Sequence, residues 1–192
     1  MGYIDLAFIY IRYNLEDIMN LVDHTDPLLR TELESFDFAN PPFDPIEFAH
    51  KIVRFMYESG GIGLAANQIG IPYRVFAMRG DPENFVCFNP KIVMPSEEHV
   101  VLEEGCLSFK NLYIAKKRPK HVRVRFQTPN GETMTRTFTG MTARIFQHEL
   151  DHLDGKTFIH DESRLKITNA VKKARKQGSV YSVGDLVLLS RA

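Results

Sequence analysis

The segment from residue 121 to 138 constrains the fold most. Its first seven residues, HVRVRFQ, alternate strictly between polar and apolar, so the apolar side chains should share one buried face of a strand. The following PNG is a turn sequence, and ETMTRTF at 132–138 can pair back as the second arm of a hairpin. The residues expected on the buried face are Val122, Val124 and Phe126. Antiparallel pairing of neighbouring strands is therefore the first expectation.

Two helices are predicted to bracket the strands. The first starts at Asp44, which can cap it, with Pro45 at the first helical position and Glu47 in place for a capping box. A glycine pair at 60–61 ends it. The second should run from about residue 139 to 153. Further strands are expected at 73–79, 85–89 and 98–103. This order favours an α+β fold, with antiparallel sheets packed around the second helix, over a doubly wound parallel sheet.

The chain has 192 residues, of which 44% are hydrophobic, which suits a single globular domain with a full core. We expect the main domain at residues 1–160 and a C-terminal extension at 161–192. Within the extension, 162–178 is predicted to form an amphipathic helix with a basic face, and 181–189 a short final strand.

Charge and composition give no indication of a nucleic-acid-binding, membrane-spanning or secreted protein. Lys plus Arg and Asp plus Glu both number 24, so nothing in the balance requires nucleic acid or an anionic membrane. No run approaches the length of a membrane span. The apolar patch at 6–11 follows Asp5 and lacks a basic flank, so we expect no signal peptide and a reducing cytoplasm. Cys87 and Cys106 are expected to be free, either as buried thiols or as metal ligands.

The second helix carries the sequence HELDH, which is typical of a metal site. His148 and His152 are one turn apart, so both imidazoles can hold the same ion. Glu149 projects near that face, where it can exchange protons with water at the metal without being a ligand. The alternative is a solvated polar helix face.

A third ligand has two possible sources. His160 and Glu162 follow the motif, as in many HExxH proteases, but lie past a glycine. Cys106 lies upstream in EEGCLSF, after a predicted strand and a glycine, and its thiolate would leave one coordination position open. At this point three functions fit the motif. They are a metal-dependent hydrolase of an amide other than a peptide bond within a chain, an HExxH endopeptidase, and a non-catalytic metal-binding protein.

Three segments together resemble the polypeptide deformylases: GIGLAANQIG (61–70), EEGCLS (103–108) and QHELDHLDG (147–155). They occur in the family's order, and the resemblance extends from roughly residue 20 to 160. It implies a catalytic domain that removes the formyl group from the N-terminal formyl-methionine of new polypeptides and releases formate. It also implies one divalent metal ion, natively Fe²⁺, which Zn²⁺, Ni²⁺ or Co²⁺ can replace.

The same resemblance assigns roles to individual residues. The implied metal ligands are Cys106, His148 and His152. Glu149 is implied as the general acid/base, while the amide of Gln68 and the backbone N–H of Leu107 are implied donors to the formyl oxygen. Gly63 is expected to make main-chain contacts with the substrate, and the implied methionine slot is formed by Ile62, Met141 and Ile145. Without the resemblance, Gln68 is better explained as the cap of a turn.

Some positions extend or depart from the family pattern. The resemblance implies that Glu104 pairs with Arg118, the alternative being a weak surface pair. Arg144 stands where relatives usually have an apolar residue, so it either snorkels along the pocket rim or alters the pocket. Lys110 and Tyr113 replace a proline and an arginine of one subgroup, which affects the preference beyond methionine.

The extension is rich in cations: Lys166, Lys172, Lys173, Arg175 and Lys176. By analogy with relatives, they are candidates for contacts with ribosomal RNA that are independent of its sequence. A solvated helix face is the alternative explanation.

Overall fold

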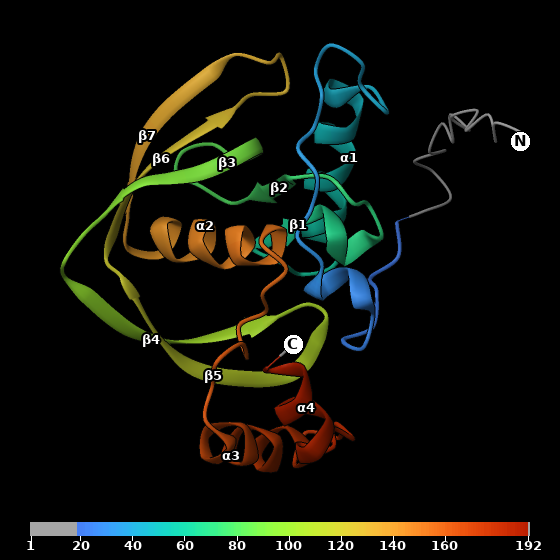
Figure 1. Cartoon of the computed structure of the whole chain (residues 1–192), viewed down its shortest axis with the longest axis vertical. Helices are drawn as coiled ribbons and strands as arrows, with labels where there is room; N and C mark the ends of the chain where they lie inside the picture. The colour runs from blue at the N-terminus through green and yellow to red at the C-terminus, as the bar shows by residue number, and fades with distance from the viewer. Residues whose placement is uncertain (1–18, 192) are drawn as a thin grey trace, which may run out of the picture.

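A computed structural model describes residues 19–191, in which a central helix, α2 (Gly140–Leu153), lies between two antiparallel sheets (Figure 1). Within these residues, one sheet has five strands in the order β1-β2-β3-β6-β7, and the other pairs β4 with β5. The strands of the larger sheet are β1 (Gly63–Ala65), β2 (Val75–Met78), β3 (Phe85–Pro95), β6 (His121–Gln127) and β7 (Thr133–Thr139). Those of the smaller sheet are β4 (His99–Cys106) and β5 (Phe109–Pro119). The predicted α+β fold around the motif-bearing helix is confirmed.

The predicted hairpin of β6 and β7 forms, and in its register Val122 lies opposite Phe138 and Phe126 opposite Met134. The alternating apolar residues of β6 are buried, because they pack on α2 through a cluster that includes Phe146. The strand pairing therefore brings the sheet onto the helix that carries both histidines.

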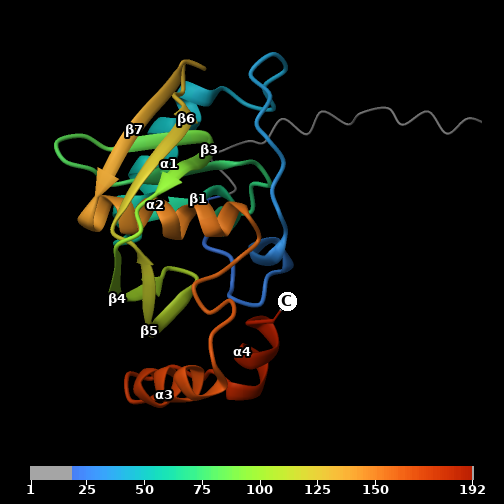
Figure 2. The ribbon, with the colours of Figure 1, turned by 60° about the vertical axis from the view of Figure 1, so that its left-hand side comes forward.

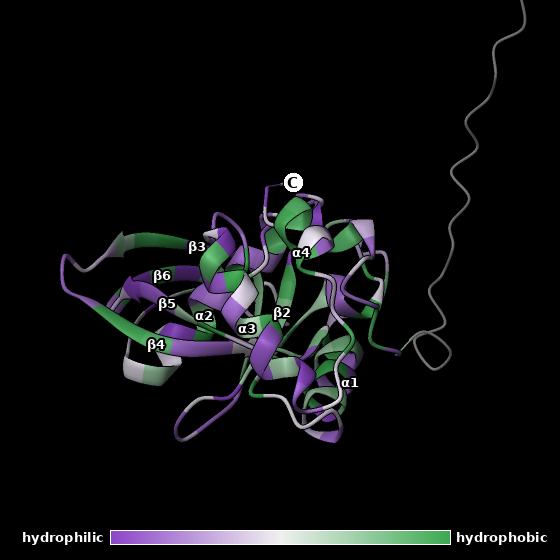
Figure 3. Ribbon diagram, turned by 90° about the horizontal axis from the view of Figure 1, so that it is seen from below, coloured by the Kyte–Doolittle hydropathy of each residue, from purple (hydrophilic) through white to green (hydrophobic). Residues whose placement is uncertain are grey.

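Helix α1 (Pro45–Glu58) begins where the sequence predicts it. The side chain of Asp44 accepts hydrogen bonds from the backbone N–H groups of Ile46 and Glu47, at 2.8 and 2.9 Å. Its apolar face packs against β1 and β2, and α1 shows both hydrophilic and hydrophobic stretches, as an amphipathic helix should (Figure 3). Two short 3₁₀ helices, η1 (Pro27–Arg30) and η2 (Ala66–Ile69), complete this part.

Strand β5 was not among the predicted strands. Its sequence contains three lysines and an arginine, which obscure the alternation of its apolar residues. The strand forms because it pairs with β4 along its length and buries Phe109, Leu112 and Ile114 against the C-terminal helices. Those partners are distant in sequence, so a local pattern does not reveal them.

The C-terminal extension consists of two helices, α3 (Arg164–Arg175) and α4 (Val183–Leu189), which lie below β5 in two views (Figures 1 and 2). The helix expected at 162–178 is confirmed, whereas the strand expected at 181–189 is wrong. Ser182 caps α4 by accepting from the N–H of Asp185 at 3.3 Å, and Leu186 is buried among the residues of α3 and β5. The cap at Ser182 and the burial of one helical face favour a helix over a strand in this segment.

The remaining sequence expectations concern the N-terminus, the membrane and Cys87. The apolar patch at 6–11 lies outside the described residues. Among the described helices, none is long and apolar enough to cross a membrane. Cys87 is a buried free thiol, and burial raises its pKa. Whether residues 1–160 form a domain distinct from 161–192 stays a prediction.

Candidate metal centre

Three potential metal-binding side chains converge where β4 meets α2. The thiol of Cys106 and the imidazoles of His148 and His152 place their ligand atoms within 4.8 Å of one another. Cys106 Sγ lies 3.3 Å from His152 Nε2. Cys106 ends β4, whereas both histidines lie one turn apart on α2. The structure therefore brings together the three residues that the sequence singled out.

The motif is not a solvated helix face. His148, Glu149 and His152 are 9%, 4% and 1% exposed, because α2 is enclosed by strands of both sheets. The downstream alternatives lie elsewhere: His160 is beside Asp161, at 3.2 Å, and Glu162 pairs with Lys166 at 2.9 Å. Of the three candidates for the third ligand, only the upstream thiol of Cys106 lies in the cluster found among the described residues.

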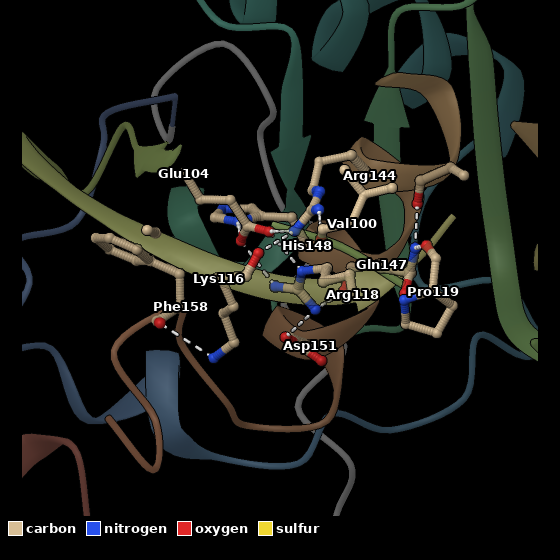
Figure 4. Close-up of polar contacts among 12 residues, drawn as sticks. Val100, Glu104, Lys116, Arg118, Pro119, Arg144, Gln147, His148, Asp151 and Phe158 are labelled. Carbon is tan, nitrogen blue, oxygen red and sulfur yellow. Dashed lines mark hydrogen bonds and ion pairs between the residues drawn. The ribbon is translucent and has the colours of Figure 1, made fainter. Parts of the chain in front are cut away.

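The buried carboxylate of Glu104 contacts one ring nitrogen of His148. Glu104 Oε2 lies 3.1 Å from His148 Nδ1 (Figure 4). Arg118 donates to both oxygens of Glu104, at 2.6 and 2.8 Å, and also to Asp151 at 2.8 Å. The predicted pair of Glu104 and Arg118 is thus confirmed, and it is buried instead of lying at the surface. Since one ring nitrogen of His148 faces Glu104, the other is free to face the cluster.

The sequence left two alternatives for Arg144: snorkelling along the pocket rim, or an altered pocket. Its side chain is buried, and its guanidinium donates to Glu104 and to the carbonyl oxygens of Val100 and Lys116. The snorkelling prediction is wrong because Glu104 provides a buried anion within reach, which water at the rim cannot match.

The electrostatics of the site follow from burial and from its anions. Burial alone would raise the pKa of Glu104, but hydrogen bonds from Arg118 and His148 hold it well below its usual range. Burial alone would lower the pKa of His148, but hydrogen bonds with Cys106 and Glu104 raise it to about 10. Burial lowers the pKa of His152 and raises that of Glu149 to about 7. The anionic surroundings of His148 therefore stabilise positive charge at the cluster.

Glu149 is placed beside the cluster with an unsatisfied oxygen. Its Oε2 is buried, and it has no hydrogen-bond partner within the described part of the chain. A Cβ atom at Gly63 would overlap Glu149 Oε1 and come within 2.8 Å of the Ile145 side chain. Glycine at 63 thus leaves the space that the carboxylate uses. Buried orphan oxygens are costly, so their presence points to a functional role.

The side-chain amide of Gln68 makes contacts through both its oxygen and its nitrogen. Its Oε1 accepts from the N–H of Ala65 at 2.9 Å, which is the turn-capping contact expected without any catalytic role. Its Nε2 lies 3.2 Å from Cys106 Sγ and 3.4 Å from Ser108 Oγ. The cap holds the amide so that its N–H₂ group faces the cluster.

A cavity of about 620 Å³ opens beside the cluster. Its lining includes Cys106, His148 and all the remaining predicted site residues except His152: Ile62, Gly63, Gln68, Leu107, Met141, Ile145 and Glu149. Ile145 is buried in the wall, whereas Ile62 and Met141 are about half exposed. Asn67 was not among the predicted site residues, yet its amide donates to the carbonyl oxygen of His152 at 2.8 Å. Its place beside Gln68 in AANQIG was the available signal.

The residues present fit a divalent cation. A thiolate and two imidazoles form a donor set that first-row metals such as Zn²⁺ and Fe²⁺ accept. His152 Nδ1 is a buried atom without a partner among the described residues, and its Nε2 is turned to the thiol of Cys106. Burial favours the neutral form of this imidazole, which is the form that binds a metal.

Comparison with known proteins gives a consistent result. Residues 18–168 match the polypeptide deformylase family. The chain is 36% identical to a peptide deformylase of Bartonella tribocorum over 176 residues, which span 88% of this chain and 98% of that protein.

Solved structures agree with this match. A peptide deformylase of Synechococcus elongatus in complex with actinonin superposes with a TM-score of 0.76 at 30% identity, covering 86% of this chain and 88% of that one. A class I type b peptide deformylase of Acinetobacter baumannii, bound to Met-Ala-Ser, gives a TM-score of 0.68 at 29% identity, covering 74% and 96%. Sequence and structure thus agree with the three motif segments, and the chain belongs to the polypeptide deformylase family.

Proposed function

We propose that this protein is a metal-dependent hydrolase that removes the N-terminal formyl group from formyl-methionyl nascent polypeptides and releases formate. Peptide deformylases catalyse this reaction, and family membership assigns it to the chain. The observation that carries the proposal is the convergence of Cys106, His148 and His152 at a cavity, beside a buried Glu149 whose Oε2 has no hydrogen-bond partner among the described residues.

Cys106, His148 and His152 are the proposed ligands of one divalent ion, with Fe²⁺ as the native metal and Zn²⁺, Ni²⁺ or Co²⁺ as substitutes. When bound, the ion supplies Lewis-acid chemistry that lowers the pKa of coordinated water from about 15.7 to near 7. The thiolate makes the donor set softer than three imidazoles. It also makes the site sensitive to oxidation.

The protein groups account for the proton transfers and for the charge. Glu149 accepts the proton of the attacking water and returns it to the amine that leaves with the peptide. As the water oxygen bonds to the formyl carbon, negative charge develops on the formyl oxygen. Gln68 Nε2 and the N–H of Leu107 are the proposed donors to that oxygen. Collapse breaks the carbon–nitrogen bond and leaves formate and a free N-terminal methionine.

The cavity lining supports a substrate with an apolar first side chain. Ile145 in the wall and Ile62 and Met141 at the mouth are the proposed contacts of the methionine. The main chain of Gly63 is the proposed partner of the peptide backbone. The Met-Ala-Ser peptide bound to the Acinetobacter enzyme has the N-terminal residue that this reaction produces.

The proposal places the enzyme in the cytoplasm, where reducing conditions keep the Cys106 thiol available. It also includes a contact between the ribosome and the basic C-terminal segment, without sequence-specific reading of RNA. Lys172 and Lys176 support this contact, because both are exposed and have no acidic partner among the described residues. The other three cations are already engaged: Lys166 with Glu162, Lys173 with Glu103, and Arg175 with the carbonyl of Tyr181.

One assay tests the function. Protein purified without oxygen and analysed for metal is incubated with formyl-Met-Ala, and formate and free alanine are both quantified. Formate without alanine supports deformylation. Alanine from cleavage of the Met-Ala bond would identify an endopeptidase instead, and neither product from metal-loaded protein would identify a non-catalytic metal protein.

A further inference from the structure

Arg144 connects the helix of the cluster to both strands of the smaller sheet. Its Nη1 donates to Glu104 Oε1 and to the carbonyl of Lys116 on β5, each at 2.8 Å, and its Nη2 donates to the carbonyl of Val100 on β4 at 2.6 Å (Figure 4). Arg144 lies on α2, one turn before His148. One guanidinium therefore bonds to β4 and β5 from α2.

This connection matters because the proposed ligands are divided between two elements. Cys106 comes from β4, and the histidines come from α2. Within the described residues, β4 and β5 pair only with each other and are not part of the five-stranded sheet. The relative placement of thiol and imidazoles therefore depends on side-chain contacts between α2 and the strand pair.

Arg144 also fixes the carboxylate that orients His148. Glu104 Oε1 accepts from Arg118 and Arg144, while its Oε2 accepts from Arg118 and faces His148 Nδ1. Arg118 approaches from β5, whereas Arg144 and His148 approach from consecutive turns of α2. The carboxylate is thus held from both elements, which restricts rotation of the His148 ring.

Stability alone does not explain a second buried guanidinium at this point. Arg118 already forms a two-pronged pair with Glu104. Replacing a whole buried ion pair by apolar residues of similar volume is often neutral for stability, so folding alone does not require charged groups at this place. Arg144 also lines the cavity, where an apolar residue would extend the surface offered to a methionine side chain.

We propose that Arg144 is a positioning residue for the metal centre: it holds Glu104, and through Glu104 and the two strand carbonyls it sets the placement of Cys106 relative to His148. The inference rests on the proposed function only in its turnover readout.

Three variants test it. Arg144→Met removes the guanidinium and keeps most of the volume. Arg144→Lys keeps the charge but cannot reach three acceptors with the same planar fork. Arg125→Met is the control, because Arg125 is exposed on β6 and has no ion-pair partner among the described residues. Each protein is loaded with Co²⁺ or Zn²⁺, and metal affinity is measured by competition with a chelator. The visible spectrum of the Co²⁺ form, the thermal unfolding midpoint, kcat and KM are recorded beside it.

Arg144→Met is expected to unfold cooperatively and to bind metal about 10–100-fold more weakly, as is typical when groups that orient metal ligands are lost. Its Co²⁺ spectrum should change, and kcat should fall more than KM rises. Arg144→Lys should recover part of the affinity, and Arg125→Met should match the parent protein.

The proposal is overturned if folded Arg144→Met binds Co²⁺ with the parent affinity and spectrum. Should Arg144→Met fail to fold, the comparison of Arg144→Lys with the parent decides: unchanged affinity and spectrum would refute the positioning role. If the parent protein releases no formate, the proposed function fails. The metal affinities and Co²⁺ spectra of the variants still test the positioning role of Arg144.

Discussion

Glu104 and His148 are 44 residues apart in the sequence, and Glu104 Oε2 lies 3.1 Å from His148 Nδ1. An ionised carboxylate only accepts hydrogen bonds, so this contact requires a proton on Nδ1 and leaves Nε2 as the ring atom that would bind a metal after losing its own proton. The buried anion is in turn neutralised by Arg118 and Arg144. The proposed metal site is therefore supported by a charge network that joins β4, β5 and α2.

Glu104→Gln should weaken both the fold and the metal site. It removes the carboxylate shared by two buried arginines, of which Arg118 keeps its pair with Asp151, and breaking a buried pair typically costs about 3–5 kcal/mol in the free energy of unfolding. Metal affinity should fall because the amide no longer holds His148 as firmly. Urea denaturation and chelator competition measure the two effects. Glu98→Gln is the control, since Glu98 is exposed and pairs only with Lys120 within the described chain, and it should leave both quantities nearly unchanged.

Glu149→Gln should separate metal binding from turnover. The amide keeps the shape of the side chain but cannot accept a proton, so kcat should fall by about 10²–10⁴-fold while the metal content stays at the parent level. Because Glu149 Oε2 is buried and has no hydrogen-bond partner within residues 19–191, the substitution should not lower the thermal unfolding midpoint. Formate release and metal analysis on the same sample provide the check. A variant with full activity would exclude Glu149 as the proton carrier.

Gly63→Ala should act on Glu149 without touching the proposed ligands. The added methyl group would overlap Glu149 Oε1 and press on Ile145, so the carboxylate must move. We expect a large loss of kcat with metal retained. Gly184→Ala adds the same methyl group at a position whose nearest neighbouring atom is 3.6 Å away, and it should leave activity unchanged. Equal activities of the two variants would contradict this account.

Gln68→Leu should lower kcat and leave the metal in place. If Gln68 donates to the developing oxyanion, losing that donor costs about 2.7–4 kcal/mol of transition-state stabilisation. The turn also loses its cap from Oε1 to the N–H of Ala65, so thermal unfolding must be measured beside the kinetics. A fall in kcat much larger than the change in stability can explain is the expected pattern. An unchanged kcat would leave Gln68 with its structural role alone.

Cys106→Ala should remove metal and activity together. The thiol is the single proposed ligand from β4, and two imidazoles alone provide one protein donor fewer than is usual for a catalytic site. Metal content after dialysis should fall to a small fraction of that in the parent protein. Treatment of the parent with a chelator should likewise abolish formate release, and added Co²⁺ or Zn²⁺ should restore it. Cys87→Ala should retain metal, because that thiol is buried in β3.

Much of the secondary structure could be read from local patterns. Asp44 and Pro45 mark the start of α1, and the strict alternation of β6 predicts both a hairpin and its buried face. Beta-branched alternation and capping residues act over a few positions, so they are visible in a short window. Local patterns wrongly predicted a strand at α4 and did not predict β5. The secondary structure of both segments depends on packing against residues distant in sequence: Leu186 packs against α3, and Leu112 packs against the C-terminal helices.

The sequence by itself determined which residues could perform the chemistry: two histidines one turn apart, a glutamate between them, and a cysteine and a glutamine in recognisable segments. The tertiary structure alone decided how they are held. The sequence showed only that Arg144 stands where relatives usually have an apolar residue, whereas in the structure it is buried and bonded to Glu104 and to two strands. The reason is physical: a charge inside a protein is stabilised only by partners that the fold brings to it, and here these lie 28 to 44 residues away.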